Sequence, residues 1–234
     1  LLSLGTITFL IGLYDDIFSV KPVNKMLIII ILAIICFFIN IRFFPSASIY
    51  VSLPLTILWF TGIVNAVNII DNMDGLSSGT SIITLLLILY FTNINQQLEL
   101  FNLAYILCFS CLGFLIFNFH PAKIFMGDSG SLFIGFMLGL FSLEVAASDG
   151  KNILATLAFP VMLMAYPIFD TILVTINRLK NNTPISRGGK DHSSHRLVRI
   201  GISQKKTILL LYSISSIFGL SAIILNNYNF RLAT

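Results

Sequence analysis

Long apolar runs alternate with short polar connections along the whole chain. The runs cover about residues 1–13, 26–44, 52–70, 80–92, 98–119, 131–147, 153–177 and 207–226. Several approach the ~20 apolar residues that a helix needs to cross a bilayer. Helices are expected because lipid offers no partner to unpaired backbone groups, and a barrel would show short alternating segments instead. The pattern predicts an all-α, polytopic transmembrane bundle of about eight helices.

Composition supports this interpretation. Of the 234 residues, 56% are hydrophobic and 10% are charged, and the mean hydropathy is +0.93. Soluble domains carry about 25% charged residues, so the composition argues against a water-soluble globule. The chain begins at Leu1, inside an apolar run, and not at a methionine. We therefore expect residues 1–234 to form a single integral-membrane domain that lacks its N-terminal helices.

The connections between the runs fall into two sets that alternate along the chain. One set holds about residues 14–25, 71–79, 120–130 and 178–206; the other holds 41–51, 93–97, 148–152 and the C-terminal tail. All 14 basic residues except Arg42, Lys151 and Arg231 lie in the first set, as do all three histidines. An excess of basic residues marks the cytoplasmic side of a membrane protein. The pattern therefore predicts a multi-pass protein with its polar chemistry on the cytoplasmic face.

The segment NAVNIIDNMDGLSSG, residues 65–79, places four polar residues at three-residue intervals: Asn65, Asn68, Asp71 and Asp74. If the helix continues to Gly75, these side chains form a slowly winding stripe. Aspartates cost about 2.5–3.5 kcal/mol each at the bilayer centre, so the stripe is expected at the cytoplasmic end, lining a wet cleft. Hydrogen bonding between helices is the structural alternative, and it suits the asparagines better than the aspartates.

Two further clusters lie in the same set of connections. GLYDDIFSVKP contains Asp15 and Asp16 at a helix end, followed by Lys21; alone, such a pair is more often a solvated helix end. FNFHPAKIFMGDSGS contains Asn118, His120, Lys123 and Asp128, and its Gly-Asp-Ser-Gly core predicts a tight turn at a helix start whose amides can meet an anion. Asp128 suits Mg²⁺, which favours one or two carboxylates plus substrate phosphates. Phe125 is either a stacking surface for a base or an interfacial apolar residue.

The largest connection gathers basic residues and histidines, namely Arg187, Lys190, His192, His195, Arg196 and Arg199. A positive-inside anchor for anionic headgroups is one interpretation, and it accounts for Lys205 and Lys206. The histidines favour a phosphate-binding loop for the 187–196 part. Asp170, in AYPIFDTILV, lies near the cytoplasmic boundary and is expected to face the bundle interior. Cys108 and Cys111 form a C-x-x-C without a second pair, so they are expected to be small residues of a membrane helix and not a zinc site.

Acids that gather a divalent metal, together with cations that neutralise phosphates, suit a reaction between a soluble phosphorylated donor and a lipid-borne phosphate. GLYDD, NAVNIIDNMDGLSSG, FNFHPAKIFMGDSGS, PIFDT and DHSSHRL, in that order over about residues 5–200, also resemble the polyprenyl-phosphate N-acetylhexosamine-1-phosphate transferases of glycosyltransferase family 4. The resemblance implies a bacterial inner-membrane enzyme that uses Mg²⁺, and Mn²⁺ stays open as an alternative ion. It would move a sugar-1-phosphate from a UDP-N-acetyl sugar, with UDP-GlcNAc the preferred donor, to undecaprenyl phosphate and release UMP.

Carried over to this chain, the resemblance implies a role for each motif residue. Asp15 and Asp16 match the catalytic acidic pair, with Asp15 preferred for deprotonating or orienting the lipid phosphate, and Asp128 matches the Mg²⁺ ligand. Asn65, Asn68, Asp71 and Asp74 would line the nucleotide cleft, and Phe125 would contact uracil. His192, His195 and Arg196 would grip the donor pyrophosphate. Lys21, Asn118 and Lys123, from the same polar clusters, are further candidates for substrate binding. The chain departs from the family at Ser194, where a histidine is usual, and in lacking the N-terminal P-T-P-x-x-G-G-like segment.

The loop resembles the branch that initiates O-antigen (lipopolysaccharide), teichoic-acid or enterobacterial polysaccharide synthesis, in cell-wall biogenesis. Three alternatives stay open: the phospho-MurNAc-pentapeptide transferase of peptidoglycan synthesis, a secondary transporter that relays protons or cations, and a non-catalytic remnant. Direct attack by the lipid phosphate is preferred over a covalent aspartyl-phosphate on Asp15 or Asp16. The lipid bilayer is an expected partner, a homodimer is a further expectation, and no nucleic acid is expected.

Overall fold

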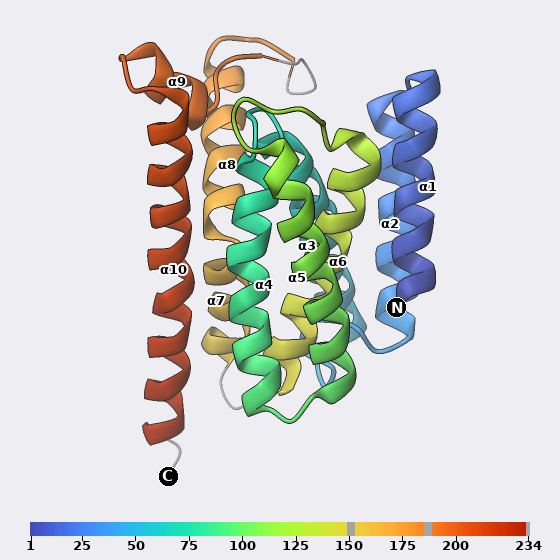
Figure 1. Ribbon diagram of the computed structural model, residues 1–234. Helices are drawn as coiled ribbons and strands as arrows, with labels where there is room; N and C mark the ends of the chain where they lie inside the picture. The colour runs from blue at the N-terminus through green and yellow to red at the C-terminus, as the bar shows by residue number, and fades with distance from the viewer. Residues whose placement is uncertain (149–152, 185–188, 233–234) are drawn as a thin grey trace.

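A computed structural model describes residues 1–148, 153–184 and 189–232, and this part of the chain contains ten helices and no strand (Figure 1). The helices are α1 (Leu2–Phe18), α2 (Pro22–Phe38), α3 (Ile49–Ile70), α4 (Leu76–Ile94), α5 (Leu98–Asn118), α6 (Gly127–Ser148), α7 (Ile153–Leu163), α8 (Ala165–Lys180), α9 (Ser193–Arg199) and α10 (Gln204–Leu232). Among the described residues, five helices are long and apolar enough to cross a membrane, or six if α7 and α8 are one broken span. The predicted multi-pass helical bundle is confirmed.

Consecutive long helices run in opposite directions, so their connections alternate between the two ends of the bundle (Figure 1). The α1–α2, α3–α4 and α5–α6 connections and the segment between α8 and α10 lie at the end that carries α9, which we call the α9 end. The polar motifs therefore lie at one end, as the alternation of runs predicts. Residues 149–152 and 185–188, and with them Arg187, lie outside the described residues.

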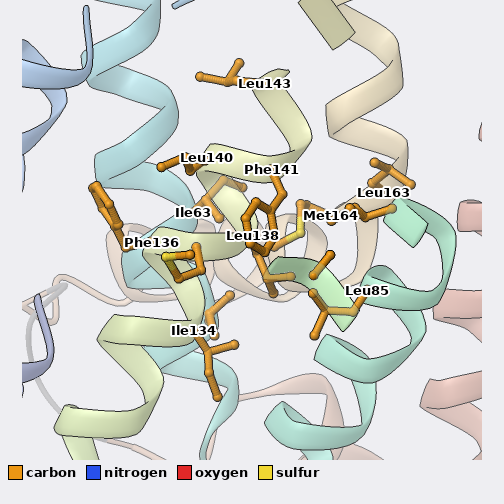
Figure 2. Packing of buried hydrophobic residues seen from close by; sticks show 14 of the residues in the cluster. Ile63, Leu85, Ile134, Phe136, Leu138, Leu140, Phe141, Leu143, Leu163 and Met164 are labelled. Atoms are coloured by element: carbon orange, nitrogen blue, oxygen red, sulfur yellow. The ribbon is translucent and has the colours of Figure 1, made fainter. Parts of the chain in front are cut away.

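Helix α6 is the central helix of the bundle. It packs against α1 on one side and against α3, α4 and α7 on the others, and 78% of its apolar stretch is buried inside the bundle. Figure 2 shows its side chains, such as Phe136 and Phe141, meeting Ile63 of α3 and Leu85 of α4. Helix α1 buries only Gly5, Thr8 and Gly12, so a row of small residues lets it approach α6 closely. Because α6 is fixed on several sides, its first turn has a fixed place at the α9 end.

Helix boundaries differ from the apolar runs at several places. The apolar run 26–44 does not stay helical to its end: α2 stops at Phe38, and Ile41 and Phe43 turn into the core, where Phe43 packs edge-on to Trp59 at 5.6 Å. Helix α6 begins at Gly127, at the Gly-Asp-Ser-Gly turn where a helix start is predicted and four residues before the apolar run. Helix α4 begins at Leu76, so the short run 80–92 is extended by Ser77 and Ser78. The predicted connection 178–206 contains the short helix α9.

The predicted span 153–177 is also wrong as a single helix, because α7 and α8 meet at an angle of 82°. Pro167 has no N–H to donate to the carbonyl of Leu163, so the helical ladder is interrupted there. The Thr84 hydroxyl, on α4, donates to that carbonyl at 3.1 Å, and α8 restarts with the Ile168 N–H on Met164. The break is therefore stabilised by a neighbouring helix, as lipid-embedded breaks require.

We predict that Thr84→Val destabilises the break, because it leaves the buried Leu163 carbonyl without a donor. The expected loss is about 0.5–1.5 kcal/mol, or a few degrees in the thermal midpoint of the purified protein in detergent. Thr92→Val is the matched control on the same helix: the Thr92 hydroxyl donates only to carbonyls of its own helix, at Ile88 and Leu89. Equal midpoints for the two variants would contradict this account.

Candidate active site

The end of α1 caps the start of α6. The Asp16 carboxylate accepts hydrogen bonds from the Asp128 N–H at 2.8 Å and the Ser129 N–H at 3.0 Å, two amides of the first turn of α6. Gly127 has φ +66°, and a Cβ there would meet the Asp16 carboxylate at 2.7 Å. A Cβ on Gly12 would lie 2.3 Å from the Asp128 carbonyl. The helix start predicted at Gly-Asp-Ser-Gly is present, but its amides bind a carboxylate of this same chain.

A lysine joins the two acidic motifs. The Lys25 ammonium donates to Asp15 at 2.6 Å and to Asp128 at 2.5 Å. Asp15 also accepts from the Val20 N–H, so its carboxylate faces the α1–α2 turn while that of Asp16 faces α6. Sequence reasoning missed Lys25 and chose Lys21, which is exposed at the N-cap of α2. The available signal was the tight α1–α2 hairpin, which returns the first turn of α2 alongside Asp15.

The polar stripe predicted for residues 65–74 is wrong, because α3 ends at Ile70 and Asp71 is its C-cap. Asn68, on the last turn of α3, donates to Asp128 at 2.9 Å and to Ser131 at 2.8 Å. Asn65 instead donates to the Thr61 carbonyl of its own helix at 2.7 Å. Gly75 has φ +73° and begins α4, so it does not terminate α3. The stripe is divided between a helix and the turn that follows it.

Asp71 lies in an environment of negative charge. Burial, together with the charges of Asp128, Asp16 and Asp74, raises the pKa of Asp71 to about 7. These four carboxylates come from three segments of the chain: the end of α1, the 71–74 turn and the start of α6. They are close enough to influence one another, which places the acidic residues of three motifs in one electrostatic neighbourhood.

Asp74 and Asn118 hold the α5–α6 connection in place. Asp74 accepts from His120 Nδ1 at 2.8 Å and from the Ala122 N–H at 3.1 Å. Asn118 is 2% exposed and is hydrogen-bonded through both its amide oxygen and its amide nitrogen: it accepts from the Gly75 N–H and the Ser78 hydroxyl and donates to the Ile124 carbonyl. Asp74 and Asn118 therefore hold the α3–α4 connection and the α5–α6 connection against each other. Lys123 and Phe125 are exposed on the outside of the same segment, Phe125 at 78%.

A buried carboxylate orients the first histidine of the largest connection. Asp170, on α8, is completely buried and accepts from His192 Nδ1 at 2.8 Å and from the Ser193 N–H at 2.7 Å. His192 is itself 5% exposed. Asp170 therefore faces the interior, as predicted, and fixes the start of α9. The departure at Ser194 has a structural counterpart, because the Ser194 hydroxyl donates to the Asn72 side chain at 2.7 Å and ties α9 to the 71–74 turn.

His195 and Arg196, adjacent in the sequence and predicted to bind the donor together, point to different sides of α9. His195 lies 6.2 Å from His192 between ring centroids, and it interacts with the Asn72 backbone; burial, together with His192 and Lys190, lowers its pKa. Arg196 instead donates through Nε to the Asp191 carbonyl at 2.9 Å. Asp191 is paired with Arg178 of α8 at 2.9 and 3.0 Å, which lowers the pKa of Asp191. His195 thus belongs to the side of the acidic turn, and Arg196 to the side of α8.

Candidate metal ligands are less concentrated than the sequence suggests. Among the described residues, no three histidine, cysteine or acidic side chains converge closely enough to hold a metal by themselves. Cys108 and Cys111 are buried free thiols in α5, in agreement with their interpretation as small helix residues. What the α9 end offers is two paired carboxylates with a lysine, an adjacent acidic turn and an ordered histidine loop. Such a set can neutralise and orient phosphate groups.

Comparison with known proteins gives matching results. Residues 1–146 match the sequence model of Glycosyl transferase family 4. The chain is 37% identical over 230 residues to a probable undecaprenyl-phosphate N-acetylglucosaminyl 1-phosphate transferase of Bacillus subtilis, covering 94% of this chain and 64% of that protein. An undecaprenyl-phosphate alpha-N-acetylglucosaminyl 1-phosphate transferase of Thermotoga maritima is 31% identical, over 91% of this chain and 65% of that protein.

A third relative, the phospho-N-acetylmuramoyl-pentapeptide-transferase of Prochlorococcus marinus, is 48% identical over 95 residues, which is 39% of this chain and 26% of that protein. The chain thus spans just under two thirds of the length of the Bacillus and Thermotoga relatives. The family match covers the α1, α3 and α6 motifs whose side chains meet at the α9 end. This chain belongs to glycosyl transferase family 4.

Proposed function

We propose that this chain carries the centre of a transferase that moves N-acetylglucosamine-1-phosphate from UDP-GlcNAc to undecaprenyl phosphate. In this reaction a phosphate oxygen of the lipid attacks the β-phosphorus of the donor. The bond from that phosphorus to the oxygen bridging to the α-phosphate breaks, and UMP leaves. The observation that carries the proposal is the Asp15–Lys25–Asp128 bridge, at the end of an apolar bundle. The related proteins act on polyprenyl phosphates by name, which supports the same acceptor here.

The contacts of the acidic pair favour direct attack over a covalent intermediate. Both oxygens of Asp16 accept backbone amides of α6, so using Asp16 as a nucleophile would uncap that helix. Asp15 is engaged at both oxygens as well, by the Val20 amide and by the Lys25 ammonium, so neither oxygen is free to act as a nucleophile. Although burial acts to raise it, the pKa of Asp15 is lowered by hydrogen bonds with Asp128, Lys25 and Val20, which keeps the carboxylate ionised. We therefore assign Asp15, together with Lys25, to orienting the lipid phosphate.

The residues present suit Mg²⁺, because this ion needs only one or two ligands from the protein. The ion commonly uses one or two carboxylates and takes its remaining ligands from water and substrate phosphates. Asp128 and Asp71 would hold it: the pKa of Asp71 is raised in part by neighbouring negative charge, which a divalent cation would relieve. The metal would neutralise the diphosphate of the donor; Mn²⁺ has compatible ligand chemistry. Lys25 supplies a second positive charge from the protein itself.

An apolar cavity offers room for the prenyl chain. It has a volume of about 400 Å³ and lies between α3 and the broken α7–α8 pair, with Leu58, Gly62 and Ala66 among its lining. Ala66 lies on the last two turns of α3, as does Asn68, whose amide contacts Asp128, although residues two apart point to opposite faces of the helix. The cavity therefore reaches the level of the bridge along α3 but on another face of that helix. We infer that the reaction takes place at the α9 end, and the excess of basic residues there supports a position on the cytoplasmic face of the bacterial inner membrane.

The product lipid would begin the synthesis of a cell-surface polysaccharide such as teichoic acid or the O-antigen of lipopolysaccharide. The local match to the Prochlorococcus protein keeps a muramoyl-pentapeptide donor as the second candidate. Both candidates share the acceptor and differ in the sugar that the donor carries. The two functions can therefore be separated by offering each donor in turn.

The first test is the reaction itself. Membranes containing the full-length protein are incubated with undecaprenyl phosphate, Mg²⁺ and either UDP-GlcNAc or UDP-MurNAc-pentapeptide, and the lipid product is identified by mass. We expect a GlcNAc-diphosphate lipid and UMP, and a loss of roughly 100-fold or more in Asp128→Asn. Product from the muramoyl donor alone would select the second candidate, and wild-type release from the variant would remove Asp128 from the mechanism.

The second prediction contrasts the two lysines of the α1–α2 turn. Lys25→Met removes the cation between Asp15 and Asp128, so we expect UMP release to fall by roughly 100-fold. Lys21→Met, the matched control four residues earlier, removes an exposed cation, and we expect a change of no more than a few-fold. The amount of folded protein is compared by size-exclusion chromatography. The larger loss in Lys21→Met would favour the sequence-based choice of Lys21 instead.

The third prediction follows from the pKa of Asp71, which is about 7 in the folded protein against an ordinary value of 3.8. Between these values the unfolded chain binds fewer protons at this group than the folded chain, so its contribution makes stability fall as pH rises. We expect the thermal midpoint of the wild type to fall, relative to Asp71→Asn, between about pH 4 and pH 7. Mg²⁺ should restore the wild type most above pH 7, where Asp71 is ionised.

The control for this experiment is Glu99→Gln, which removes an exposed carboxylate at the opposite end of the bundle. Its midpoints should run parallel to those of the wild type over the whole pH range. A parallel course for Asp71→Asn as well would show that Asp71 does not titrate in this window. An equal effect of Mg²⁺ on all three proteins would argue against Asp71 as part of a metal site.

A further inference from the structure

The first two turns of α8 hold the loop that leads into α9. Asp170 is completely buried, and its carboxylate accepts hydrogen bonds from His192 Nδ1 at 2.8 Å and from the Ser193 N–H at 2.7 Å. Tyr166, which is 1% exposed, places its hydroxyl 3.3 Å from the Ser193 hydroxyl. Tyr166 and Asp170 follow the α7–α8 break by only a few residues. The direction that α8 takes at the break therefore decides where α9 begins.

His192 has almost no surface left for a substrate. Its Nδ1 is occupied by Asp170, and its side chain is 6% exposed. The charge of the pair is also unsuited to a diphosphate. With Asp170 ionised, a protonated imidazole makes the pair neutral, and a neutral imidazole leaves it with a negative charge. A diphosphate against this ring would therefore lose water without meeting a net positive charge, which is unfavourable.

His195, three residues later, has different surroundings. Its ring centroid lies 6.2 Å from that of His192, with an angle of 66° between the ring planes, and the residue is partly exposed. The ring interacts with the backbone of Asn72, next to Asp71 in the 71–74 turn. The Ser194 hydroxyl contacts the Asn72 side chain as well. His195 therefore lies on the side of α9 where the metal and the donor diphosphate are proposed to bind.

We propose that Asp170 is a positioning residue of the transferase, which acts through His192 to fix the start of α9 so that His195 faces the donor diphosphate. In this arrangement His192 holds the loop and touches no substrate. The bond from Ser194 to Asn72 completes it, because it ties the first turn of α9 to the 71–74 turn. The inference rests on the proposed function, and it divides between two histidines a role that the family resemblance gives to both.

Asparagine and glutamine distinguish the two ring nitrogens of His192. The amide nitrogen of asparagine stands close to the position of Nδ1, and that of glutamine close to the position of Nε2. His192→Asn can still donate to Asp170, so we expect its UMP release and its KM for UDP-GlcNAc to stay within a few-fold of the wild type. His192→Gln loses that hydrogen bond, and we expect its KM for UDP-GlcNAc to rise roughly tenfold while the KM for undecaprenyl phosphate is unchanged. The reverse order of the two variants would show that Nε2 touches substrate and would overturn the proposal.

A double-mutant cycle tests whether Asp170 and His192 act as one unit. Asp170→Asn should raise the KM for UDP-GlcNAc about as much as His192→Gln, and the double variant should be no worse than either single variant, because both changes remove the same hydrogen bond. In a His195→Ala background, His192→Gln should have little further effect, since the position of His195 then no longer matters. Asn181→Ala, at the exposed end of α8, is the control and should keep the wild-type KM. Additive losses in either double variant would contradict the proposal.

Amide hydrogen exchange of the full-length protein in nanodiscs measures the positioning without the reaction. The Ser193 N–H donates to Asp170, and the Arg196 N–H donates to the His192 carbonyl. We expect exchange over residues 191–199 to be roughly tenfold faster than in the wild type in His192→Gln and Asp170→Asn, and unchanged in His192→Asn. Equal exchange in all four proteins would refute the proposal. A wild type that forms no lipid product with any donor would instead refute the proposed function, and the exchange rates would still decide whether Asp170 holds α9.

Discussion

The close contact between the end of α1 and the start of α6 is the constraint on which the α9 end depends. Ionised carboxylates at the end of an apolar bundle are stabilised by partners, because an unpaired charge near lipid is costly. Asp16 is paired with the amides of α6, and Asp15 and Asp128 share the ammonium of Lys25. Gly12 makes this possible, since any Cβ would collide with the Asp128 carbonyl. The small residues of α1 allow the close approach to α6 that brings Asp15 and Asp16 to the first turn of α6.

From this contact the other segments are placed in sequence. Asn68 ties α3 to Asp128, so the end of α3 and the turn that follows it lie beside the first turn of α6. Ser194 then ties α9 to that turn through Asn72, and Asp170 fixes the preceding His192. Each contact joins segments that are far apart along the chain. These contacts hold the Asp15–Lys25–Asp128 bridge and the loop that contains His192 and His195 together at the α9 end of the bundle.

Helix α9 has two faces with different chemistry. One face follows the acidic turn through Ser194 and His195, and the other presents Arg196 and Arg199 to a polar cavity at the end of α8. Residues of the single motif DHSSHRL therefore contact two different parts of the protein, the 71–74 turn and the end of α8.

The sequence alone determined the helical class, the order of the runs and the end at which the polar motifs gather, because apolar length and alternating connections are local properties of the chain. It also marked Asp15, Asp16, Asp71 and Asp128. It could not show that Lys25 lies between Asp15 and Asp128, that α3 stops at Ile70, or that α8 breaks away from α7. Those features depend on contacts between distant segments: a carboxylate that caps another helix, and a Thr84 hydroxyl that replaces the hydrogen bond lost at Pro167. Such contacts exist only once the helices have packed.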